Sequence, residues 1–483
     1  MNNAPTLLWF RNDLRISDNP ALLAAAARGA PVLGLYILDT AGDRRPMGAA
    51  SRWWLQHSLT RLGESLAALG SRLVVLEGDP ETLLPATVAA LGAKAVVWNR
   101  RYGAAERRLD GALKETLRGR GVSVESFNAS LLREPWEVRS QAGAPMKVFT
   151  PFWKAARAQG PFAAPLAAPG PMPALGDLPP LPGQIDLADV FHLNAPVDWT
   201  LEMATTWQPG EAGAQARLAA FLSGGLRGYA EDRNRPDRTS TSFLSPHLAF
   251  GEIGPRQIIQ TSTFAVESGE SPAGTDDLTK FFSEVGWREF AYHLLYDNPD
   301  LAKTNIQRKF DAFPWQGDAA HLKAWQRGQT GYPIVDAGMR QLWQTGWMHN
   351  RVRMVVASFL IKHLLIDWRV GEDWFWDTLV DADPANNPAS WQWVAGSGAD
   401  AAPYYRIFNP MLQGVKFDPD GTYVRQFVPE LESMPSAHIH APWQAPPHIL
   451  RQARVDLGRT YPRPIVDHDA ARARALAAYK DMG

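Results

Sequence analysis

Residues 6–38, TLLWFRNDLRISDNPALLAAAARGAPVLGLYIL, decide the fold of the first part of the chain. Apolar runs at Thr6–Phe10 and Pro31–Leu38 flank a helix-like segment at Pro20–Arg28. Continuous apolar runs of this length are typical of strands that are buried on both faces. Their alternation with helices predicts a parallel, doubly wound, Rossmann-like sheet. We expect further strands at Arg72–Glu77, Ala95–Trp98 and Val122–Phe127, and further helices at Ser51–Leu69, Glu81–Leu91 and Glu106–Arg118.

The turn that follows the first strand, Arg11–Arg15, contains no glycine. Neither the G-x-G-x-x-G fingerprint of dinucleotide-binding folds nor a Walker-type loop occurs there. The usual backbone cradle for phosphates is therefore absent, and this domain must hold any ligand by other means.

The second half of the chain has a different pattern. Beyond about residue 200, apolar residues recur at helical spacing, and few strand-like alternations occur. Gly160–Gly183 is rich in Pro, Gly and Ala, a composition typical of a surface linker. We therefore predict an α/β domain at 1–135, an inter-domain linker at 136–200 and an all-α domain at 201–483. The expected helices include Ala216–Leu226, Leu278–Tyr296, Leu322–Arg327, Ile334–Trp343, Arg351–Leu365 and Trp374–Leu379.

The composition excludes several classes of protein. The 483 residues include no cysteine, which excludes disulfides, thiol nucleophiles and thiolate metal sites. The 49 basic and 50 acidic residues give a net charge of -1, so no overall field attracts nucleic acid, although a local basic groove is compatible with this balance. No apolar stretch approaches the ~18 residues of a membrane span, and the N-terminus has no signal-peptide pattern. We expect a soluble, cytoplasmic protein.

Tryptophan is unusually frequent in this chain. There are 19 Trp and only 11 Tyr, and ten of the Trp lie between Trp287 and Trp393. Large rings serve most often as filler of a helical core. Alternatively, indoles near a redox cofactor serve as electron relays. Composition alone favours the core interpretation.

A hydroxyl-rich segment, Thr239–His247 (TSTSFLSPH), follows a run of arginines at Arg233, Arg235 and Arg238. Hydroxyl and N–H groups beside arginines, where a helix begins, form a site suited to a pyrophosphate. An ordinary Ser/Thr-rich loop with a helix N-cap is the better explanation of this segment taken alone.

Two helical segments carry further candidates. Glu284 and Arg288 are one turn apart, and a surface ion pair beside a buried Trp287 is the commoner explanation of that pattern. Asn350 and Met354 are also one turn apart, so both can face one cavity. The neighbouring His349 has no second ligand at metal-binding spacing, so we expect no metal site.

The last cluster is Asp381–Trp393, DADPANNPASWQW, which we expect to be a turn-rich loop. Asx turns explain its Asp and Asn residues. They do not explain two indoles, Trp391 and Trp393, on the same loop.

In this order, behind a Rossmann-like domain, these clusters resemble the photolyase/cryptochrome family. The similarity covers essentially the whole chain, and it is closest to the bacterial enzymes that repair cyclobutane pyrimidine dimers in DNA, among them the class III group. Its most specific stretches are Thr241–Ser245, Trp287–Phe290, Gly331–Asp336, Gly346–Met354 and Asp381–Pro410.

The resemblance implies a U-shaped FAD in the helical domain, active in its fully reduced, anionic form. Asn387, four residues before Trp391, is implied to face the flavin N5 atom, whereas Asn386 is the weaker candidate because the alignment needs no gap. An amide cannot readily protonate the flavin, which favours the reduced anion. The other residues implied to bind FAD are Tyr229, Arg233, Thr241, Ser242, Leu244, Ser245, Trp287, Asn350, Arg353, Asp381 and Asp383.

The resemblance also strengthens the relay interpretation of the tryptophans. Trp391, Trp368 and Trp315 match the family's chain of three indoles from flavin to surface. Three other tryptophans keep the core interpretation: Trp325, Trp343 and Trp374.

For the substrate, the resemblance implies UV-damaged DNA with the dimer turned out of the duplex. Photolyases of the (6-4) lesion have two histidines where this chain has Asn350 and Met354, which favours the cyclobutane dimer. The dimer pocket is implied to be formed by Glu284, Trp287, Asn350, Met354 and Trp393. The residues expected to contact DNA phosphates are Arg233, Arg351, Arg406 and Lys416, and Arg288 is a further residue expected to bind the substrate.

Family members also carry a light-harvesting antenna pigment on the α/β domain. The Asn-Glu pair that often binds methenyltetrahydrofolate is replaced here by Ala105-Glu106, so only Glu106 is retained. A folate bound somewhat differently is the favoured hypothesis. A deazaflavin or an empty site stays open.

We expect a repair enzyme that is a monomer, and two other functions are the alternatives to repair. A signalling cryptochrome would have the same fold and FAD without repair, but the retained Glu284, Asn350 and Met354 favour repair. A dark flavin oxidoreductase or a plain nucleotide-binding module would need a nicotinamide or phosphate fingerprint, and the chain has none.

Overall fold

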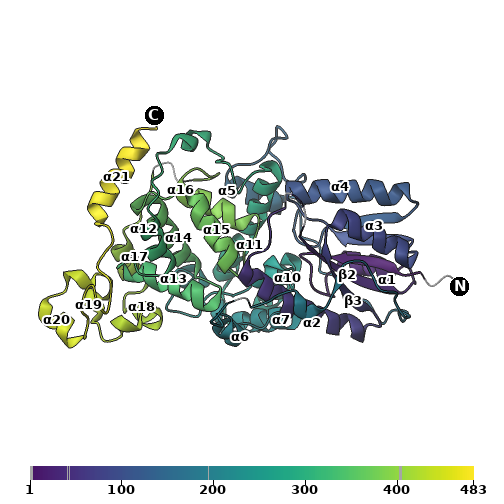
Figure 1. Cartoon of the computed structure of the whole chain (residues 1–483), viewed down its shortest axis with the longest axis horizontal. Helices are drawn as coiled ribbons and strands as arrows, with labels where there is room; N and C mark the ends of the chain where they lie inside the picture. The colour runs from purple at the N-terminus through teal and green to yellow at the C-terminus, as the bar shows by residue number, and fades with distance from the viewer. Residues whose placement is uncertain (1–3, 41, 43, 194, 402–404, 483) are drawn as a thin grey trace.

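The α/β domain lies at one end of the molecule, where α3 and α4 run beside its strands, and the helical domain lies at the other end (Figure 1). The sheet of the α/β domain has six strands in the order β5-β4-β1-β2-β3-β6. The computed structural model describes residues 4–40, 42, 44–193, 195–401 and 405–482. All strand pairs are parallel except the antiparallel pair of β3 and β6. The predicted parallel, doubly wound sheet is confirmed. The strands are Thr6–Phe10 (β1), Val32–Asp39 (β2), Arg72–Gly78 (β3), Ala95–Asn99 (β4), Ser123–Phe127 (β5) and Gln184–Ile185 (β6).

Helices cover both faces of this sheet. Successive residues of a strand point to opposite sides, so each strand contributes side chains to the two apolar cores, one on each face of the sheet. Leu8 and Phe10 of β1 join the core under α1 and α2, whereas Leu7 and Trp9 join the core under α3 and α4. The four helices are Pro20–Ala26 (α1), Ala49–Ala68 (α2), Pro80–Leu91 (α3) and Ala104–Gly119 (α4).

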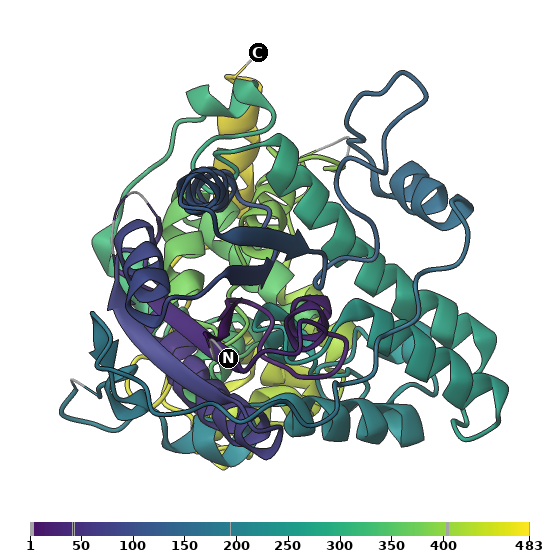
Figure 2. The same cartoon turned by 90° about the vertical axis from the view of Figure 1, so that its right-hand side faces the viewer.

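The predicted linker, 136–200, contains regular structure. Helix α5, Phe149–Ala158, packs with its aromatic side chains into the core of the helical domain. The Pro- and Gly-rich part that follows has no helix or strand, and it crosses the outside of the α/β domain before it forms β6 (Figure 2). Backbone bonds fix this part to the domain, for example from Met172 N–H to the Leu69 carbonyl (2.7 Å). The segment predicted as the inter-domain linker, 136–200, thus contains α5, which packs in the helical domain, and β6, which pairs with the sheet.

The second half of the chain is helical, as predicted. Two apolar cores organise it: one lies among α13, α14, α15 and α16, and the other among α5, α7, α10 and α11. Within the described residues, no helix is both long and apolar enough to cross a membrane. The helices are Leu201–Thr206 (α6), Glu211–Ala220 (α7), Tyr229–Asp232 (α8), Ser245–Ala249 (α9), Pro255–Glu267 (α10), Thr275–Asp297 (α11), Ala319–Gln326 (α12), Pro333–Thr345 (α13), Asn350–Ser358 (α14), Trp368–Thr378 (α15), Asn386–Ala395 (α16), Pro410–Phe417 (α17), Thr422–Phe427 (α18), Ser436–Ile439 (α19), Pro447–Gln452 (α20) and His468–Lys480 (α21).

Residues 381–393 are not one loop, which corrects the sequence-based expectation. The loop ends at Ala385, and α16 carries Trp391 and Trp393. The carboxylate of Asp383 starts this helix, because it accepts the backbone N–H groups of Ala385 (2.9 Å) and Asn386 (2.7 Å). A carboxylate in this position satisfies donors that the first turn of a helix leaves free.

The two domains share a buried interface. Trp54 of α2 lies in one apolar cluster with Trp207 and Trp347 of the helical domain, so the interior is continuous across the boundary. The indole N–H of Trp54 donates to Glu252 (2.9 Å), whose other carboxylate oxygen pairs with His247 (2.5 Å). A buried network of this kind fixes the orientation of the domains.

Gly371 of α15 lies directly under Trp391, and an added Cβ atom would come within 2.2 Å of the indole. We expect Gly371→Ala to destabilise the protein by about 1–3 kcal/mol through overpacking. Gly111→Ala on α4 is the matched control, since nothing lies within 4 Å of its Cβ position. There, alanine should stabilise by up to about 1 kcal/mol. Thermal unfolding of both variants tests the contrast, and equal stability would contradict it.

Candidate active site

The carboxylate of Asp381 connects the loop before α16 to α14. Both terminal guanidinium nitrogens of Arg353 donate hydrogen bonds to this carboxylate, at 3.1 and 2.8 Å. The Nε atom of Arg353 donates a third bond to the carbonyl of Met348 (2.7 Å). A two-pronged pair of this type is strong and fixes the orientation of both side chains. Two residues expected at the flavin, Arg353 and Asp381, are thus in contact.

The next carboxylate, Asp383, connects the same loop to α11 through the hydroxyl of Tyr292 (2.8 Å). Asp383 also accepts a hydrogen bond from the side-chain amide nitrogen of Asn386 (2.9 Å). The amide nitrogen of Asn387 instead donates to Glu372 on α15, at 2.8 Å to the carboxylate and 3.1 Å to the carbonyl. Sequence analysis missed Tyr292 and Glu372, since both lie inside helical patterns and outside every motif.

The hydroxyl-rich segment forms a bend that leads into α9. Phe243 has a φ of 54°, which is uncommon for a residue other than glycine. Ser245 accepts a hydrogen bond from the indole of Trp347 (3.1 Å), and Ser242 accepts one from the N–H of Leu244 (3.4 Å). The hydroxyl of Thr241 is buried and has no partner among the described residues. Because buried hydroxyls are normally bonded, this one fits a site that a polar ligand completes.

Glu284 of α11 has two cationic neighbours, Arg233 (2.5 Å) and Lys280 (3.1 Å). The guanidinium of Arg233 lies 5.9 Å from the ring of Tyr229. Burial, with the nearby Glu284 charge, raises the pKa of Tyr229 to about 12, so its hydroxyl stays a donor. Arg233, expected at the phosphates of the cofactor, is thus paired with a residue expected at the substrate.

Two half-buried indoles, those of Trp287 and Trp393, are held by Phe149 and Asp400, which are bonded to each other. Trp287 stacks on Phe149 of α5 with ring centres 3.9 Å apart, and Trp393 donates to the carbonyl of Asp400 (3.0 Å). The carboxylate of Asp400 accepts the N–H of Phe149 (3.2 Å), which connects the two indoles. The sequence pattern gave no sign of Phe149, because it lies in the predicted linker.

The three relay candidates run from the interior to partial exposure. Trp391 and Trp368 are buried in one core cluster, and the half-buried Trp315 packs against that cluster. The indole of Trp368 donates to Asn305 (2.9 Å). Trp325 also touches Trp391, with ring centres 6.3 Å apart and an edge-on orientation.

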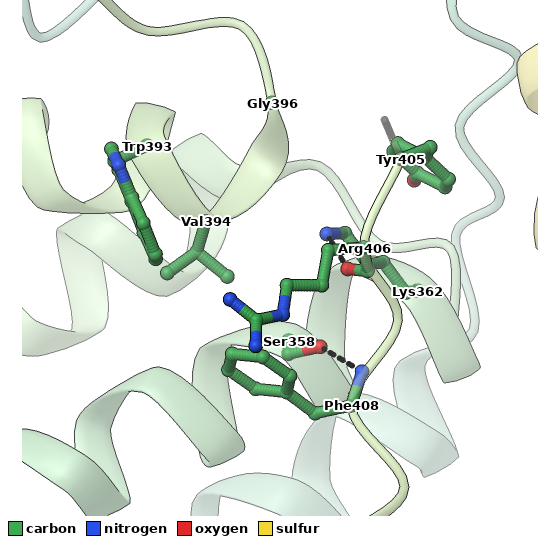
Figure 3. A pocket seen from close by; sticks show the side chains of 8 residues that line it. All are labelled: Ser358, Lys362, Trp393, Val394, Gly396, Tyr405, Arg406 and Phe408. Atoms are coloured by element: carbon green, nitrogen blue, oxygen red, sulfur yellow. Dashed lines mark hydrogen bonds between the residues drawn. The ribbon is translucent and has the colours of Figure 1, made fainter. Parts of the chain in front are cut away.

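Three basic side chains, Arg351, Arg406 and Lys416, lie beside aromatic rings of the helical domain. Arg351 and Lys416 flank Phe417 of α17, at 4.5 and 5.3 Å from its ring centre. On α14, Asn350 is exposed and Met354 is half-buried. Arg406 points into a small pocket beside Trp393, together with Phe408 and Val394 (Figure 3).

The floor of that pocket contains Lys362, which sequence analysis did not single out. Its ammonium group donates to the carbonyl of Arg406 and lies 4.6 Å from the ring centre of Tyr405 (Figure 3). Burial, reinforced by the charge of Arg406, lowers the pKa of Lys362 to about 7. Lys362 therefore fixes the backbone that carries Arg406.

Arg288 does not face the substrate side, which corrects its assignment. Its guanidinium is buried, donates to the carbonyl of Ser130 after β5 (2.7 Å) and lies 4.7 Å from the ring centre of Tyr292. Although Glu284 and Arg288 are one turn apart, they share no ion pair, because Glu284 pairs with Lys280 and Arg233. Arg288 joins the two domains instead.

The α/β domain has its own cluster of polar side chains where β1 and β4 end. These strands are the point at which the strand order reverses, the usual ligand position in such folds. Arg11 bonds Asp110 (2.9 Å), whereas Arg101 is buried with two nitrogens that have no partner among the described residues. Glu106, in the first turn of α4, raises the pKa of Arg101, although burial lowers it overall. Arg101 was not among the predicted residues.

No group of three or more His, Asp or Glu side chains that could hold a metal ion occurs in the described part of the chain. His349 is buried, and its Nδ1 atom accepts the N–H of Arg351 (3.1 Å) at the start of α14. It serves as a helix cap.

Comparison with known proteins decides the family. Residues 6–173 match the model described as DNA photolyase, and residues 281–481 match the FAD binding domain of DNA photolyase. The deoxyribodipyrimidine photo-lyase of Agrobacterium fabrum is 52% identical over 480 residues, which cover 99% of this chain and 98% of that relative. The chain belongs to the photolyase/cryptochrome family.

Both branches of the photolyase/cryptochrome family are represented among the similar proteins. A solved bacterial class III photolyase from Agrobacterium tumefaciens superposes with a TM-score of 0.95 and 51% identity, covering 100% of this chain and 98% of that one. Cryptochrome-1 of Arabidopsis thaliana is 39% identical and covers 99% of this chain, which spans 70% of it. The predicted family is thus confirmed, and with it an FAD-binding domain.

The cap formed by His349 makes stability depend on pH. Burial, and then the charges of Arg351, Arg233 and Arg353, lower the pKa of His349 to about 3. Below a pH of about 6.5, the unfolded chain binds a proton there that the folded protein does not. Stability should therefore fall between pH 7.5 and 5, by about 2 kcal/mol from this group.

His349→Asn keeps a capping side chain without the titration. Urea unfolding at pH 7.5 and 5 should show a smaller loss for this variant than for the natural protein. The other buried histidines titrate equally in both proteins, so they cancel in the difference. An equal loss would contradict the assignment.

Proposed function

We propose that this protein is a light-driven DNA repair enzyme that uses FAD to split cyclobutane pyrimidine dimers. The observation that carries the proposal is the full-length 52% identity to a deoxyribodipyrimidine photo-lyase. The bond between Arg353 and Asp381, and the position of Asn387 and Trp391 on the helix that follows, support it. Bound FAD supplies the chemistry, a light-excited electron that is lent to the dimer and returned.

The residues of this chain fit FAD as follows. Thr241, whose buried hydroxyl has no partner among the described residues, would hold the phosphate and ribityl side with Ser242 and Ser245. The Arg353–Asp381 pair would hold the edge of the isoalloxazine ring. Asn387 would present its amide oxygen to N5, since its amide nitrogen is bonded to Glu372.

On the substrate side, the extruded pyrimidines would lie against Trp287 and Trp393. Photolyases take the target base out of the stack, and a damaged base costs least to extrude. Glu284, with Asn350, would hydrogen-bond the polar edges of the bases. Asn350 and Met354, where (6-4) enzymes have histidines, support the cyclobutane dimer as the substrate.

The phosphates of damaged DNA would contact Arg351, Arg406 and Lys416. With a net charge of -1, attraction has to come from this local group, so binding should weaken with salt and depend little on sequence. Arg233 is a weaker candidate than expected because Glu284 neutralises it.

The test is a blue-light repair assay on an oligonucleotide that contains one thymine dimer, with a dark sample as control. We expect repair only in the light, and Glu284→Gln should lower the repair yield more than DNA binding, since Glu284 would stabilise the electron-bearing dimer by a hydrogen bond. Protein that contains reduced FAD and repairs nothing in the light would overturn the proposal.

A relay along Trp391, Trp368 and Trp315 would restore the reduced flavin, because indole is the side chain most easily oxidised. Trp391→Phe should block photoreduction of oxidised flavin and leave repair by chemically reduced protein unchanged. Time-resolved absorption after a blue flash measures the first step. Unchanged photoreduction in the variant would move the route to the neighbouring Trp325, which touches Trp391.

A photoreceptor without repair is the second candidate, because Arabidopsis Cryptochrome-1 matches over nearly the whole chain. It predicts flavin photoreduction without repair in the same assay. The higher identity to the photo-lyase and the class III structural match favour repair.

An antenna pigment, methenyltetrahydrofolate by preference, would lie beside the polar cluster where β1 and β4 end. Buried nitrogens of Arg101 without a partner among the described residues fit an anionic or carbonyl-bearing ligand, and Glu106 lies at the start of the adjoining α4. A deazaflavin fits the same chemistry. The absorption spectrum of the supernatant after denaturation distinguishes the two pigments and identifies the flavin.

A further inference from the structure

One loop of the α/β domain is packed tightly against α15 of the helical domain. The indole N–H of Trp376 donates to the carbonyl of Pro46 (2.8 Å), and the N–H of Ala49 donates to Asp377 (2.9 Å). Between them, a Cβ atom on Gly48 would lie 2.1 Å from the carbonyl oxygen of Trp376. The loop therefore cannot shift relative to α15 without breaking several contacts.

This loop brings Arg45 to the buried carboxylate of Glu372. The guanidinium of Arg45 lies 2.9 and 2.7 Å from the two carboxylate oxygens of Glu372 and 4.3 Å from the ring centre of Trp376. Arg45 also pairs with the exposed Asp373 (2.5 Å). Glu372 is 1% exposed, and Arg45 is its only cationic partner within the described residues.

On its other side, Glu372 holds the amide of Asn387. Both hydrogen bonds of the Asn387 nitrogen go to residue 372, one to the carboxylate and one to the carbonyl. No donor among the described residues bonds the amide oxygen of Asn387. The nitrogen of this amide is therefore turned to α15, and the oxygen is left for the site.

We propose that Arg45 is a positioning residue for the flavin-facing amide: its charge keeps Glu372 ionised, which holds the Asn387 nitrogen on Glu372 and turns its oxygen to the flavin. This inference rests on the proposed function, in which Asn387 faces N5. An ionised carboxylate only accepts hydrogen bonds, whereas a neutral carboxyl group also donates. A buried carboxylate that loses its cation becomes neutral more readily.

The orientation of the amide has a chemical consequence. Fully reduced flavin carries a hydrogen on N5, whereas N5 of oxidised flavin only accepts hydrogen bonds. An amide oxygen facing N5 therefore favours the reduced form, and an amide nitrogen there favours the oxidised form. Because Arg45 belongs to the α/β domain, this domain contributes to the redox balance of a flavin bound by the other domain.

The experiment measures the ratio of reduced to oxidised flavin in the FAD-loaded protein, equilibrated with a reference dye. Arg45→Met should shift this ratio roughly tenfold toward the oxidised form, equivalent to about 1.4 kcal/mol. Arg45→Lys keeps the charge and should restore most of the ratio. Glu372→Gln, which adds a donor, should shift the ratio like Arg45→Met, and the double variant should shift it no further.

Asp377→Ala is the matched control, because it removes a bond of the same loop to the same helix without touching Glu372. It should leave the ratio unchanged, and FAD content and thermal unfolding of each variant report any general damage. The inference is overturned if Arg45→Met leaves the ratio unchanged, if Asp377→Ala shifts it equally, or if the double variant shifts it further.

The inference and the proposed function can fail separately. Natural protein that repairs dimers in blue light while Arg45→Met leaves the flavin ratio unchanged refutes the inference alone. Natural protein that repairs nothing, with the ratio shifted as expected in Arg45→Met, refutes the repair activity alone.

Discussion

The carboxylate of Asp383 is the interaction on which the arrangement of the active site depends. It accepts hydrogen bonds from Tyr292 of α11, from the first backbone N–H groups of α16 and from the Asn386 side chain. These bonds start α16 at a fixed place against α11. The positions of Asn387, Trp391 and Trp393 follow, because all three lie on that helix. One buried charge thus sets the direction of the amide and of two indoles.

A second layer of contacts extends this arrangement to the other domain. The small Gly371 lets α15 approach Trp391 closely, and Glu372, the next residue, holds Asn387. The opposite side of α15 is bonded to the loop before α2. The helix is therefore fixed between the site and the α/β domain, so that the domains act as one support for the site.

Local patterns were sufficient to predict the sheet and most helices. Continuous apolar runs such as Thr6–Phe10 have few alternatives to a buried strand. The errors concern segments that are ordered by distant contacts. Residues 386–393 looked like part of a loop because Asn and Pro suggest turns, but the Asp383 cap and the burial of Trp391 favour the helix. Helix α5 was missed because its partner, α11, is far away in sequence.

Only some residues of the candidate site could be predicted from the sequence, and the others depend on tertiary contacts. The motifs identified Arg353 and Asp381, which bond each other, and Asn387, which bonds Glu372. Glu372 and Lys362 could not be predicted, since an isolated charged residue in a helical pattern normally faces solvent, and Arg45 lies in a loop outside every motif. Arg288 was misassigned for the same reason: spacing places it one turn from Glu284, but only tertiary packing shows that it turns toward Ser130.

The two-residue strand β6 has a consequence for the solubility of the α/β domain. An uncovered edge strand offers free N–H and C=O groups to any other extended chain, which invites aggregation. By pairing with Val75 and Leu76 of β3, the end of the connecting segment covers part of that margin. The segment that connects the two domains therefore also hinders the addition of a strand from another molecule at this edge of the sheet.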